Sequence, residues 1–447
     1  MKHFIKKLLG KTFSPDSFLY ETYHKARGIA AAVLAGFPAR RMIVIGVTGT
    51  NGKTTTCNLL ANILEETGKK VGLATTVNFW IGDKRWVNET KMTTFSPFRL
   101  QQLLRQMAAA KCRYAVIETS SHALAQHRTW GIDYDIAVFT NLTPEHLDFH
   151  RTFENYRDAK VKLFKQLFAF RRKGNTPKVA VINLDDPAAE FFTQHPADNK
   201  FFYSIDKYEA ASTKESFVTA NIIQASERST AFELSTPLGN VTLDLRLPGQ
   251  FNVRNALAAA SAASALGLPL ELIKKGLEKV TGVPGRMERI DAGQPFTVIV
   301  DYAHTPDGFE QVLSTARSFT SGKLIAVFGA AGDRDKTKRP KLGAVAGKYA
   351  DIIILTEEDP ASEDPLKIIE AIKTGIPAHF RESVNLFTIP MRKDAVFKAF
   401  QMSRAGDTVM LLAMGAQTKM ATRKGFIPYD EREVARNLLR LTVGHTK

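Results

Sequence analysis

The chain of 447 residues is 44% hydrophobic and carries a formal net charge of +16. A chain of this length is too long for one ordinary core and indicates about two to four domains. It contains no apolar run of the roughly 18 residues that a spanning helix needs, and no secretory signal, so we expect a cytoplasmic protein. The only cysteines, Cys57 and Cys112, exclude a disulfide framework and a multi-cysteine zinc site and are expected to be buried thiols.

The large positive charge predicts an anionic ligand. Lys and Arg are dispersed, and no basic run is interleaved with aromatic residues as a groove for single-stranded nucleic acid requires. We therefore expect nucleotide phosphates, and no nucleic acid, as the main anionic ligand. The basic segment of residues 1–11 adds a weaker alternative, association with an anionic membrane surface.

Strand and helix patterns alternate along most of the chain, which predicts an α/β protein with parallel sheets. A helical pattern at 18–34 is followed by an apolar strand at 42–47, a Gly/Thr/Asn loop, and a helix from Lys53 to about Gly68. Period-two alternation over residues 217–247 predicts hairpins appended to the sheet. The other elements predicted before residue 281 are strands at 114–117, 136–139 and 179–182 and helices at 252–266 and 269–280.

Residues 281–285 (Thr-Gly-Val-Pro-Gly) predict a hinge, because Gly and Pro punctuate the chain and no apolar periodicity crosses the segment. Strands then alternate with helices again, which predicts a second, Rossmann-like doubly wound domain. Its strands are predicted at 297–300, 324–328, 352–355 and 409–412. The chain is therefore divided into a short helical N-terminal extension (1–41), a central ATP-binding domain with a phosphate loop and parallel sheet (42–284), and a C-terminal domain (285–447).

The strongest single motif is the phosphate loop at 46–55, Gly-Val-Thr-Gly-Thr-Asn-Gly-Lys-Thr-Thr. Glycines let backbone N–H groups close around phosphate oxygens, Lys53 can reach the terminal phosphates, and the Thr54 hydroxyl can bind Mg²⁺. Val47 stands where the usual spacing has its first glycine. The loop predicts ATP binding but leaves the reaction open. Its candidate ATP-binding residues are Gly49, Thr50, Asn51, Gly52, Lys53, Thr54 and Thr55.

Further motifs follow this loop in a fixed order, and together they resemble the Mur ligases, most closely the MurE branch. The Gly-Thr-Asn-Gly-Lys-Thr of the loop, His-Leu-Asp-Phe-His at 146–150, Gly-Arg-Met-Glu at 285–288 and Asp-Tyr-Ala-His-Thr-Pro at 301–306 carry the resemblance, which extends over about residues 42–440. The remaining matching segments are 118–122, 126–128, 141–145, 156–160, 249–255 and 328–335.

The resemblance implies an ATP-dependent acid–amino acid ligase of peptidoglycan precursor synthesis. Such an enzyme phosphorylates a terminal carboxylate to an acyl phosphate, which an amine then attacks, with release of ADP and phosphate. The expected substrates are a UDP-N-acetylmuramoyl-peptide-like acceptor and an amino acid, with diamino acids among the candidates. We expect the protein to act as a monomer.

The resemblance also implies a metal site with two Mg²⁺ ions and catalytic roles for Lys53, Glu118, His146 and Lys160. Thr54 and Glu118 match the ligands of one ion, and His146 those of the other. Lys160 lies on a predicted helix, where a lone lysine is usually a surface residue; the matching lysine of the family is carbamylated. Carbamylation turns the cation into an anion that can support Mg²⁺, whereas a bare ammonium would repel it.

Two further groups of residues are implied as ligand contacts. Loop residues that match the acceptor site would otherwise serve as caps and solvated positions, and Asn252 would otherwise be a helix N-cap. The acceptor candidates are Thr93, Thr94, Ser120, Gln126 and Arg128. The additional nucleotide candidates are Asn252, Arg286, Asp301, Tyr302 and His304.

The chain departs from the MurE pattern at two places. Diaminopimelate-adding members carry Asp-Asn-Pro-Arg, whose Arg forks onto the distal carboxylate; here residues 358–361 read Glu-Asp-Pro-Ala, and Lys419 replaces an acid. Glu358, Asp359 and Lys419 are thus the predicted amino-acid contacts, diaminopimelate is disfavoured, and L-lysine and other amino acids stay open. A MurE also has a uridine-binding domain before its phosphate loop, whereas residues 1–41 are too few for one, which leaves recognition of the UDP end open.

Two alternative functions remain. A folylpolyglutamate- or cyanophycin-type amide ligase also lacks the uridine domain, although the motifs at 146–150 and 301–304 weigh against the folate type. A nonenzymatic, nucleotide-regulated binding protein derived from a ligase is the alternative from another class. The retained Lys53, Glu118, His146 and Lys160 argue against it.

Overall fold

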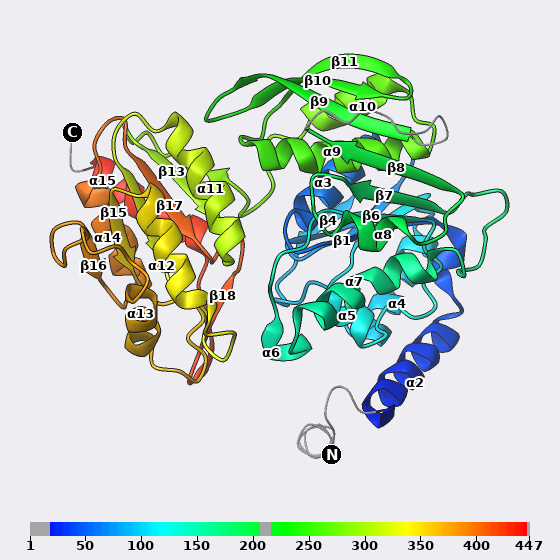
Figure 1. Cartoon of the computed structure of the whole chain (residues 1–447), viewed down its shortest axis with the longest axis horizontal. Helices are drawn as coiled ribbons and strands as arrows, with labels where there is room; N and C mark the ends of the chain where they lie inside the picture. Colours follow the sequence, from blue (N-terminus) through cyan, green and yellow to red (C-terminus); the bar gives the residue numbers. More distant parts are fainter. Residues whose placement is uncertain (1–17, 206–215, 445–447) are drawn as a thin grey trace. The chain divides into compact units, whose positions relative to one another are not determined.

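The computed structural model describes residues 18–205 and 216–444 and divides the chain into two compact units (Figure 1). The first unit runs through Asn221 and adds Glu233–Leu243 and Arg254–Lys279; the second contains Ile222–Phe232, Asp244–Val253 and the chain from Val280 onward. Strands alternate with helices in both units, so the predicted α/β class is confirmed. The basic segment of residues 1–11 lies outside the described residues.

A large sheet has the strand order β11-β10-β9-β8-β7-β6-β1-β5-β2-β3-β4, and its strands from β8 to β4 lie in the first unit. At its centre, β1 (Ile43–Thr48) pairs in parallel with β5 (Tyr114–Glu118) and β6 (Ile136–Phe139). These strands are buried along their whole length, which explains their uninterrupted apolar runs. Because parallel strands end at the same edge, the loops after Thr48, Glu118 and Phe139 come together there.

The other strands of this sheet include the predicted period-two region. In β10 the buried residues Thr230, Phe232 and Leu234 alternate with half-buried ones, as the pattern predicted. The bounds are β2 (Val71–Ala74), β3 (Asn78–Ile81), β4 (Lys84–Val87), β7 (Val179–Asn183), β8 (Asn199–Ser204), β9 (Ser216–Ala225), β10 (Thr230–Thr236) and β11 (Gly239–Leu245).

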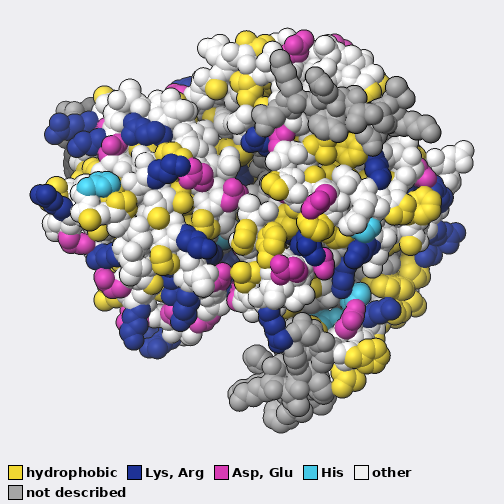
Figure 2. Space-filling view, in the orientation of Figure 1, with side chains coloured by type: hydrophobic (Ala, Val, Ile, Leu, Met, Phe, Trp, Pro, Cys, Tyr) yellow, Lys and Arg dark blue, Asp and Glu magenta, His cyan; other side chains and the backbone are white. Residues whose placement is uncertain are grey.

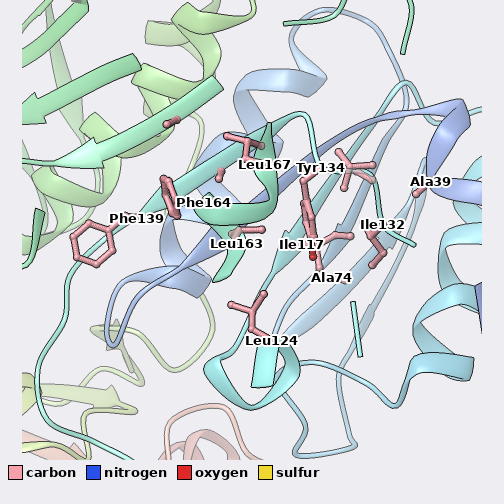
Figure 3. Close-up of a cluster of buried hydrophobic side chains, with 14 of the residues drawn as sticks. Ala39, Ala74, Ile117, Leu124, Ile132, Tyr134, Phe139, Leu163, Phe164 and Leu167 are labelled. Atoms are coloured by element: carbon pink, nitrogen blue, oxygen red, sulfur yellow. The ribbon is translucent and has the colours of Figure 1, made fainter. Parts of the chain in front are cut away.

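Helices of the first unit cover the sheet and close its core. Figure 3 shows the packing of Leu163, Phe164 and Leu167 near Tyr134 and Ile117; these side chains are at most 1% exposed. Both cysteines are buried, as expected. The helices are α2 (Phe18–Ala35), η1 (Pro38–Arg41), α3 (Lys53–Glu65), α4 (Pro97–Ala109), α5 (Ser121–Ala125), α6 (Leu147–His150), α7 (Phe153–Leu167), α8 (Ala189–Thr193), α9 (Gln250–Ala265) and α10 (Leu270–Glu278).

The second unit has a sheet of order β12-β13-β17-β14-β15-β16. All its pairings are parallel except that of β12 with β13. Successive residues of β13 enter separate cores, Ile299 in one and Val298 and Val300 in the other, so the sheet is covered on both faces as in a doubly wound fold. The strands are β12 (Glu288–Arg289), β13 (Thr297–Asp301), β14 (Leu324–Phe328), β15 (Ile352–Leu355), β16 (Leu386–Thr388) and β17 (Thr408–Leu412).

Five helices and a hairpin complete the described part of this unit. They are α11 (Pro306–Phe319), α12 (Lys338–Tyr349), α13 (Pro365–Lys373), α14 (Arg392–Met402) and α15 (Glu431–Gly444), with β18 (Lys419–Thr422) and β19 (Gly425–Pro428). None of the helices in residues 18–205 and 216–444 combines the length and the apolar content that crossing a bilayer requires. On the face shown in Figure 2, Lys and Arg side chains are scattered among acidic and apolar ones.

Candidate active site

The phosphate loop connects β1 to α3, and its conformation requires glycine at two positions. Gly49 has a φ of 149°, and a Cβ there would lie 1.8 Å from Thr140 Oγ1. Gly52 has a φ of 81°, and a Cβ there would lie 2.2 Å from Asn255 Oδ1. Other segments thus press closely on the loop, which leads directly into the positive N-terminal end of α3. This geometry is suited to an anion such as phosphate.

Asn141, in the loop after β6, holds the phosphate loop in place. Its carbonyl oxygen accepts a hydrogen bond from Thr50 N at 2.8 Å, and its Oδ1 accepts one from Asn51 N at 2.8 Å. Lys53 Nζ donates to the Thr50 carbonyl oxygen at 2.7 Å. The loop predicted from glycines and Lys-Thr is therefore also shaped by a residue from another strand end.

Glu118 stands at the end of β5 beside this loop and is 2% exposed. Its Oε2 accepts hydrogen bonds from Thr54 Oγ1 at 2.9 Å and from Thr76 N at 2.8 Å, and its Oε1 accepts one from Thr76 Oγ1 at 3.0 Å. The described residues contain no group of three or more His, Cys, Asp or Glu that could hold a metal by themselves. A hydroxyl and a carboxylate side by side do fit Mg²⁺, which completes its shell with phosphate oxygens and water.

Lys160 is not a surface lysine, although its place on a helix suggested one. It lies on α7 and is 1% exposed, with Nζ 2.5 Å from the Gly49 carbonyl oxygen and 4.4 Å from the centre of the Tyr156 ring. Burial, assisted by the charge of Lys53, lowers the pKa of Lys160 well below its usual value. The nearby Glu145 and Glu118 oppose that shift.

His146 precedes α6 in a left-handed conformation, with a φ of 57°. Its Nε2 lies 3.5 Å from Glu145 Oε2, and its ring lies 4.6 Å from that of His122. The nearby His150 Nε2 lies 3.0 Å from Ser121 Oγ, and burial lowers the pKa of His150 to about 4. Glu145 and His122 belong to the matching segments but are not among the predicted site residues.

The five acceptor candidates lie close to Glu118 in a continuous network. Thr94 Oγ1 donates to the Glu118 carbonyl oxygen at 3.0 Å and lies 3.1 Å from Ser120 Oγ. Arg128 Nη1 donates to the Thr94 carbonyl oxygen at 3.0 Å, and Arg128 Nε donates to Gln126 Oε1 at 2.9 Å. The Oγ1 of the fifth candidate, Thr93, lies 3.1 Å from Thr76 Oγ1.

In the second unit, four of the nucleotide candidates form one cluster around buried Asp301. Its two carboxylate oxygens accept hydrogen bonds from Met287 N at 2.7 Å and Ala303 N at 2.6 Å. Arg286 lies over the Tyr302 ring at 4.6 Å, and His304 Nδ1 is 2.9 Å from the Tyr302 carbonyl oxygen. Burial raises the pKa of Asp301, and Arg286 opposes that rise.

The N-cap alternative for Asn252 was wrong. Helix α9 begins at Gln250, so Asn252 lies inside it, and its Nδ2 donates to the Pro248 carbonyl oxygen at 2.8 Å. An N-cap side chain would instead accept from a helical N–H.

Two of the three predicted amino-acid contacts, Glu358 and Asp359, follow β15, and the third is in β18. Glu358 is 5% exposed, and burial raises its pKa, while Lys338, His304 and Arg392 lower it. Asp359 Oδ1 accepts a hydrogen bond from Ala421 N in β18 at 2.7 Å. Lys419, at the start of the same strand, is half-buried. The hairpin thus brings the segments around 359 and 419 together.

Two family models match the chain in the order of its units. The Mur ligase middle domain matches residues 47–263, and the Mur ligase, glutamate ligase domain matches residues 285–415. A UDP-N-acetylmuramyl-tripeptide synthetase of a Roseiflexus species is 45% identical over 415 residues, which cover 92% of this chain and 81% of that protein. A UDP-N-acetylmuramoyl-L-alanyl-D-glutamate–2,6-diaminopimelate ligase of Geobacillus kaustophilus is 42% identical over 412 residues, covering 92% and 82%.

Solved structures agree with the sequence comparison. A structure of a UDP-N-acetylmuramoyl-L-alanyl-D-glutamate–2,6-diaminopimelate ligase matches with a TM-score of 0.60 and 33% identity, covering 90% of this chain and 79% of that one. The folylpolyglutamate synthase of Mycobacterium tuberculosis complexed with ADP matches with a TM-score of 0.67, covering 92% and 94%, but at 18% identity it shares the fold alone. The chain therefore belongs to the Mur ligase family and is an ATP-dependent acid–amino acid ligase of the MurE type, acting in peptidoglycan synthesis.

Proposed function

We propose that this ligase extends UDP-N-acetylmuramoyl-dipeptide by one diamino acid. An oxygen of the terminal carboxylate attacks the γ-phosphorus of ATP, and ADP leaves. The uncharged amine then attacks the acyl carbon, phosphate leaves with the former carboxylate oxygen, and the nitrogen loses a proton. The observation that carries the proposal is the continuous network from the Thr54–Glu118 contact through Thr94 to Arg128, which connects the phosphate loop to the proposed acceptor contacts.

Thr54 and Glu118 would hold one Mg²⁺, and His146 with a carbamylated Lys160 would support a second. Bound Mg²⁺ neutralises negative charge that concentrates on the transferred phosphoryl group. Lys53 contributes a positive charge from the loop itself, where its Nζ already lies against the Thr50 carbonyl oxygen.

Carbamylation of Lys160 is supported by its surroundings. Only the neutral amine can attack CO₂, and burial, assisted by Lys53, lowers the pKa of Lys160 and so favours that form. The product is an anion on a side chain that is 1% exposed.

Two further groups of residues would contact the acceptor and the nucleotide. Thr93, Thr94, Ser120, Gln126 and Arg128 would hold the acceptor, because they surround the carbonyl end of Glu118. The proposed nucleotide contacts are Gly49, Thr50, Asn51, Gly52, Thr55, Asn252, Arg286, Asp301, Tyr302 and His304.

A diamino acid is proposed because two acids, buried Glu358 and half-buried Asp359, are among the predicted amino-acid contacts. The carboxylates of Glu358 and Asp359 favour the second ammonium group of a diamino acid. Two residues weigh the other way: Ala361 supplies no guanidinium for the distal carboxylate of diaminopimelate, and the charge of Lys419 opposes a cation. Relatives at 42% identity are named as diaminopimelate ligases. L-Lysine and meso-diaminopimelate are therefore the two candidates within this class.

The test is phosphate release by the purified chain with ATP, Mg²⁺ and UDP-N-acetylmuramoyl-dipeptide. Release should require both the acceptor and an amino acid, and one of the two diamino acids should give the highest kcat/KM among these and the twenty common amino acids. Equal release without the acceptor, or no release with any pair, would contradict the proposal.

We also propose that the functional divisions lie at 1–41, 42–284 and 285–447, and that the protein works as a monomer in the cytoplasm. The change of family model between residues 263 and 285 supports the second boundary. Light scattering of the purified chain, with and without ATP, checks the monomer.

A further inference from the structure

Helix α2 is seated tightly on the turn that carries Gln126 and Arg128. A Cβ on Gly28 would come within 2.5 Å of the His127 carbonyl oxygen, and a Cβ on Gly131 within 2.5 Å of Ala32 Cβ. The other main contact of α2 is with α4 (Figure 1). Small residues on one face of α2 therefore allow the helix to approach this turn at backbone distance, which fixes the position of its remaining side chains.

Hydrogen bonds also connect α2 to the acceptor network. Gln126 Nε2 donates to Tyr20 Oη at 3.1 Å, while Gln126 Oε1 accepts from Arg128 Nε at 2.9 Å and from Arg128 Nη2 at 2.5 Å. Because the amide nitrogen of Gln126 donates to Tyr20, the amide oxygen of Gln126 is turned toward Arg128. Tyr20 thereby acts through Gln126 to orient the guanidinium.

Glu21 of α2 is an acid beside this turn, where its Oε1 lies 3.2 Å from His127 Nε2, but among the described residues no ion pair joins an acid to Arg27 or Arg128. Within residues 18–205 and 216–444, the hydrogen bonds of Arg128 go only to neutral oxygens, and the guanidinium of Arg27 lies 5.4 Å from the centre of the Tyr23 ring. Burial, then Arg27 and Arg128, lower the pKa of His24 to about 4, and burial lowers that of Arg128. His24 also lies 4.3 Å from the Tyr20 ring. The charges of Arg27 and Arg128 thus both act on His24, whose ring lies against that of Tyr20.

We propose that Arg27 and His24 of α2, together with Arg128, bind an oxyanion of the acceptor, and that α2 forms one wall of the acceptor site. The inference rests on the proposed function. Guanidinium groups prefer phosphate and carboxylate oxygens, which they bind through paired N–H groups. The proposed acceptor offers both, as a diphosphate and as peptide carboxylates. Tyr20 is a positioning residue for this site.

The test compares Arg27→Gln with Lys25→Gln, which removes one charge from an exposed position of the same helix. Loss of a charge-assisted contact should raise the acceptor KM of Arg27→Gln by about tenfold or more, with kcat and the KM values for ATP and amino acid within about twofold. Arg27→Lys should recover part of the affinity. Tyr20→Phe should raise the acceptor KM by a smaller factor, about threefold, at unchanged kcat.

The source of the oxyanion is distinguished by a second acceptor, the muramyl dipeptide without its nucleotide diphosphate. A KM effect seen only with the UDP-linked acceptor identifies the diphosphate, and an equal effect with both identifies a peptide carboxylate. If Arg27→Gln and Lys25→Gln give the same acceptor KM in an active enzyme, the inference is overturned while the proposed function stands. A wild-type chain inactive with every pair would overturn both.

Discussion

The side-chain nitrogen of Lys160 lies 2.5 Å from the carbonyl oxygen of Gly49, so a buried amine on α7 contacts the first conformationally restricted glycine of the phosphate loop. The two residues are 111 positions apart in the chain. This contact places a chemically modifiable group beside the predicted nucleotide and metal site. Its consequences can be measured.

Replacing Lys160 with Ala should reduce ligase activity about 100-fold or more, because the support for the second Mg²⁺ is lost. Lys165→Ala, on the exposed side of the same helix, is the matched control and should retain full activity. Kinetics of phosphate release at saturating ATP and Mg²⁺ measure both variants. Full activity of Lys160→Ala would refute the role.

The carbamate itself can be observed. Protein equilibrated with ¹³C-bicarbonate should show a carbamate carbon resonance in the wild type and in Lys165→Ala, and none in Lys160→Ala. Small carboxylates such as acetate should partly restore Lys160→Ala, since they supply the missing anion. A wild-type spectrum without the resonance would remove carbamylation from the mechanism.

Glu118→Gln keeps the shape of the side chain but removes its charge. We expect the Mg²⁺ concentration for half-maximal activity to rise by about tenfold or more, because Thr54 then lacks its anionic partner at the metal site. Titration of activity with Mg²⁺ measures this. The control is Glu65→Gln, whose carboxylate pairs with exposed Arg85 away from the loop. An unchanged Mg²⁺ requirement in Glu118→Gln would argue that the ion binds elsewhere.

Gly49→Ala should destabilise the protein by about 1–3 kcal/mol, since its Cβ would lie 1.8 Å from Thr140 Oγ1 and the loop cannot widen without displacing that residue. Gly68→Ala is the control: Gly68 also has a positive φ, but no atom lies within 4 Å of the added Cβ. It should cost only about 1 kcal/mol of backbone strain. Urea unfolding gives both free energies, and calorimetry should detect ATP binding only in the control. Equal effects of the two substitutions would contradict the close approach.

Burial raises the pKa of Glu358, so this carboxyl takes up a proton at a pH where an exposed glutamate is still ionised. The KM for the diamino acid should therefore rise as the pH falls through this raised pKa, because the ammonium loses its anionic partner. Glu358→Gln should show a high KM with little pH dependence. Rate measurements across pH 4.5 to 8, roughly the range that spans a raised glutamate pKa, check both.

The raised pKa of Glu358 also determines how the stability of the folded protein depends on pH. Because the folded state holds the proton more tightly than the unfolded state, the contribution of Glu358 to stability is fully present below the unfolded pKa. It is lost as the pH rises through the folded pKa. Glu358→Gln should remove this part of the pH dependence of the free energy of unfolding, which urea unfolding at several pH values measures. A free energy that instead rises with pH would show that the carboxylate is stabilised when charged.

The central strands and the phosphate loop could be predicted from the sequence because their determinants are local. Buried parallel strands appear as short apolar runs, and β1, β5 and β6 lie within a residue of their predicted bounds. The strands β2, β3, β4, β8, β12 and β16 and the hairpin β18–β19 were not predicted. β4 and β19 are exposed along their whole length, so burial imposes no apolar pattern on them.

The candidate site was only partly predictable. Glu118 and Thr54 follow directly from a strand end and a loop motif. Thr76 carries no local signal, and the matching segments that contain Asn141 and Tyr156 do not reveal which residues these side chains contact. Thr50 Oγ1, for example, lies 2.9 Å from Tyr156 Oη, and these residues are 106 positions apart. Such partners are selected by the packing of parallel strands and not by their neighbours in the chain.

The sequence by itself determined the α/β class, the phosphate loop and the ordered motifs that identify a Mur-type ligase, because each depends on residue types within a few positions of one another. Only the tertiary structure decided that Lys160 is buried against the loop, that Asn252 lies inside its helix, and that Tyr20 of α2 reaches the acceptor network. Burial and the pKa shifts that follow from it depend on which segments meet in space. No local pattern encodes that.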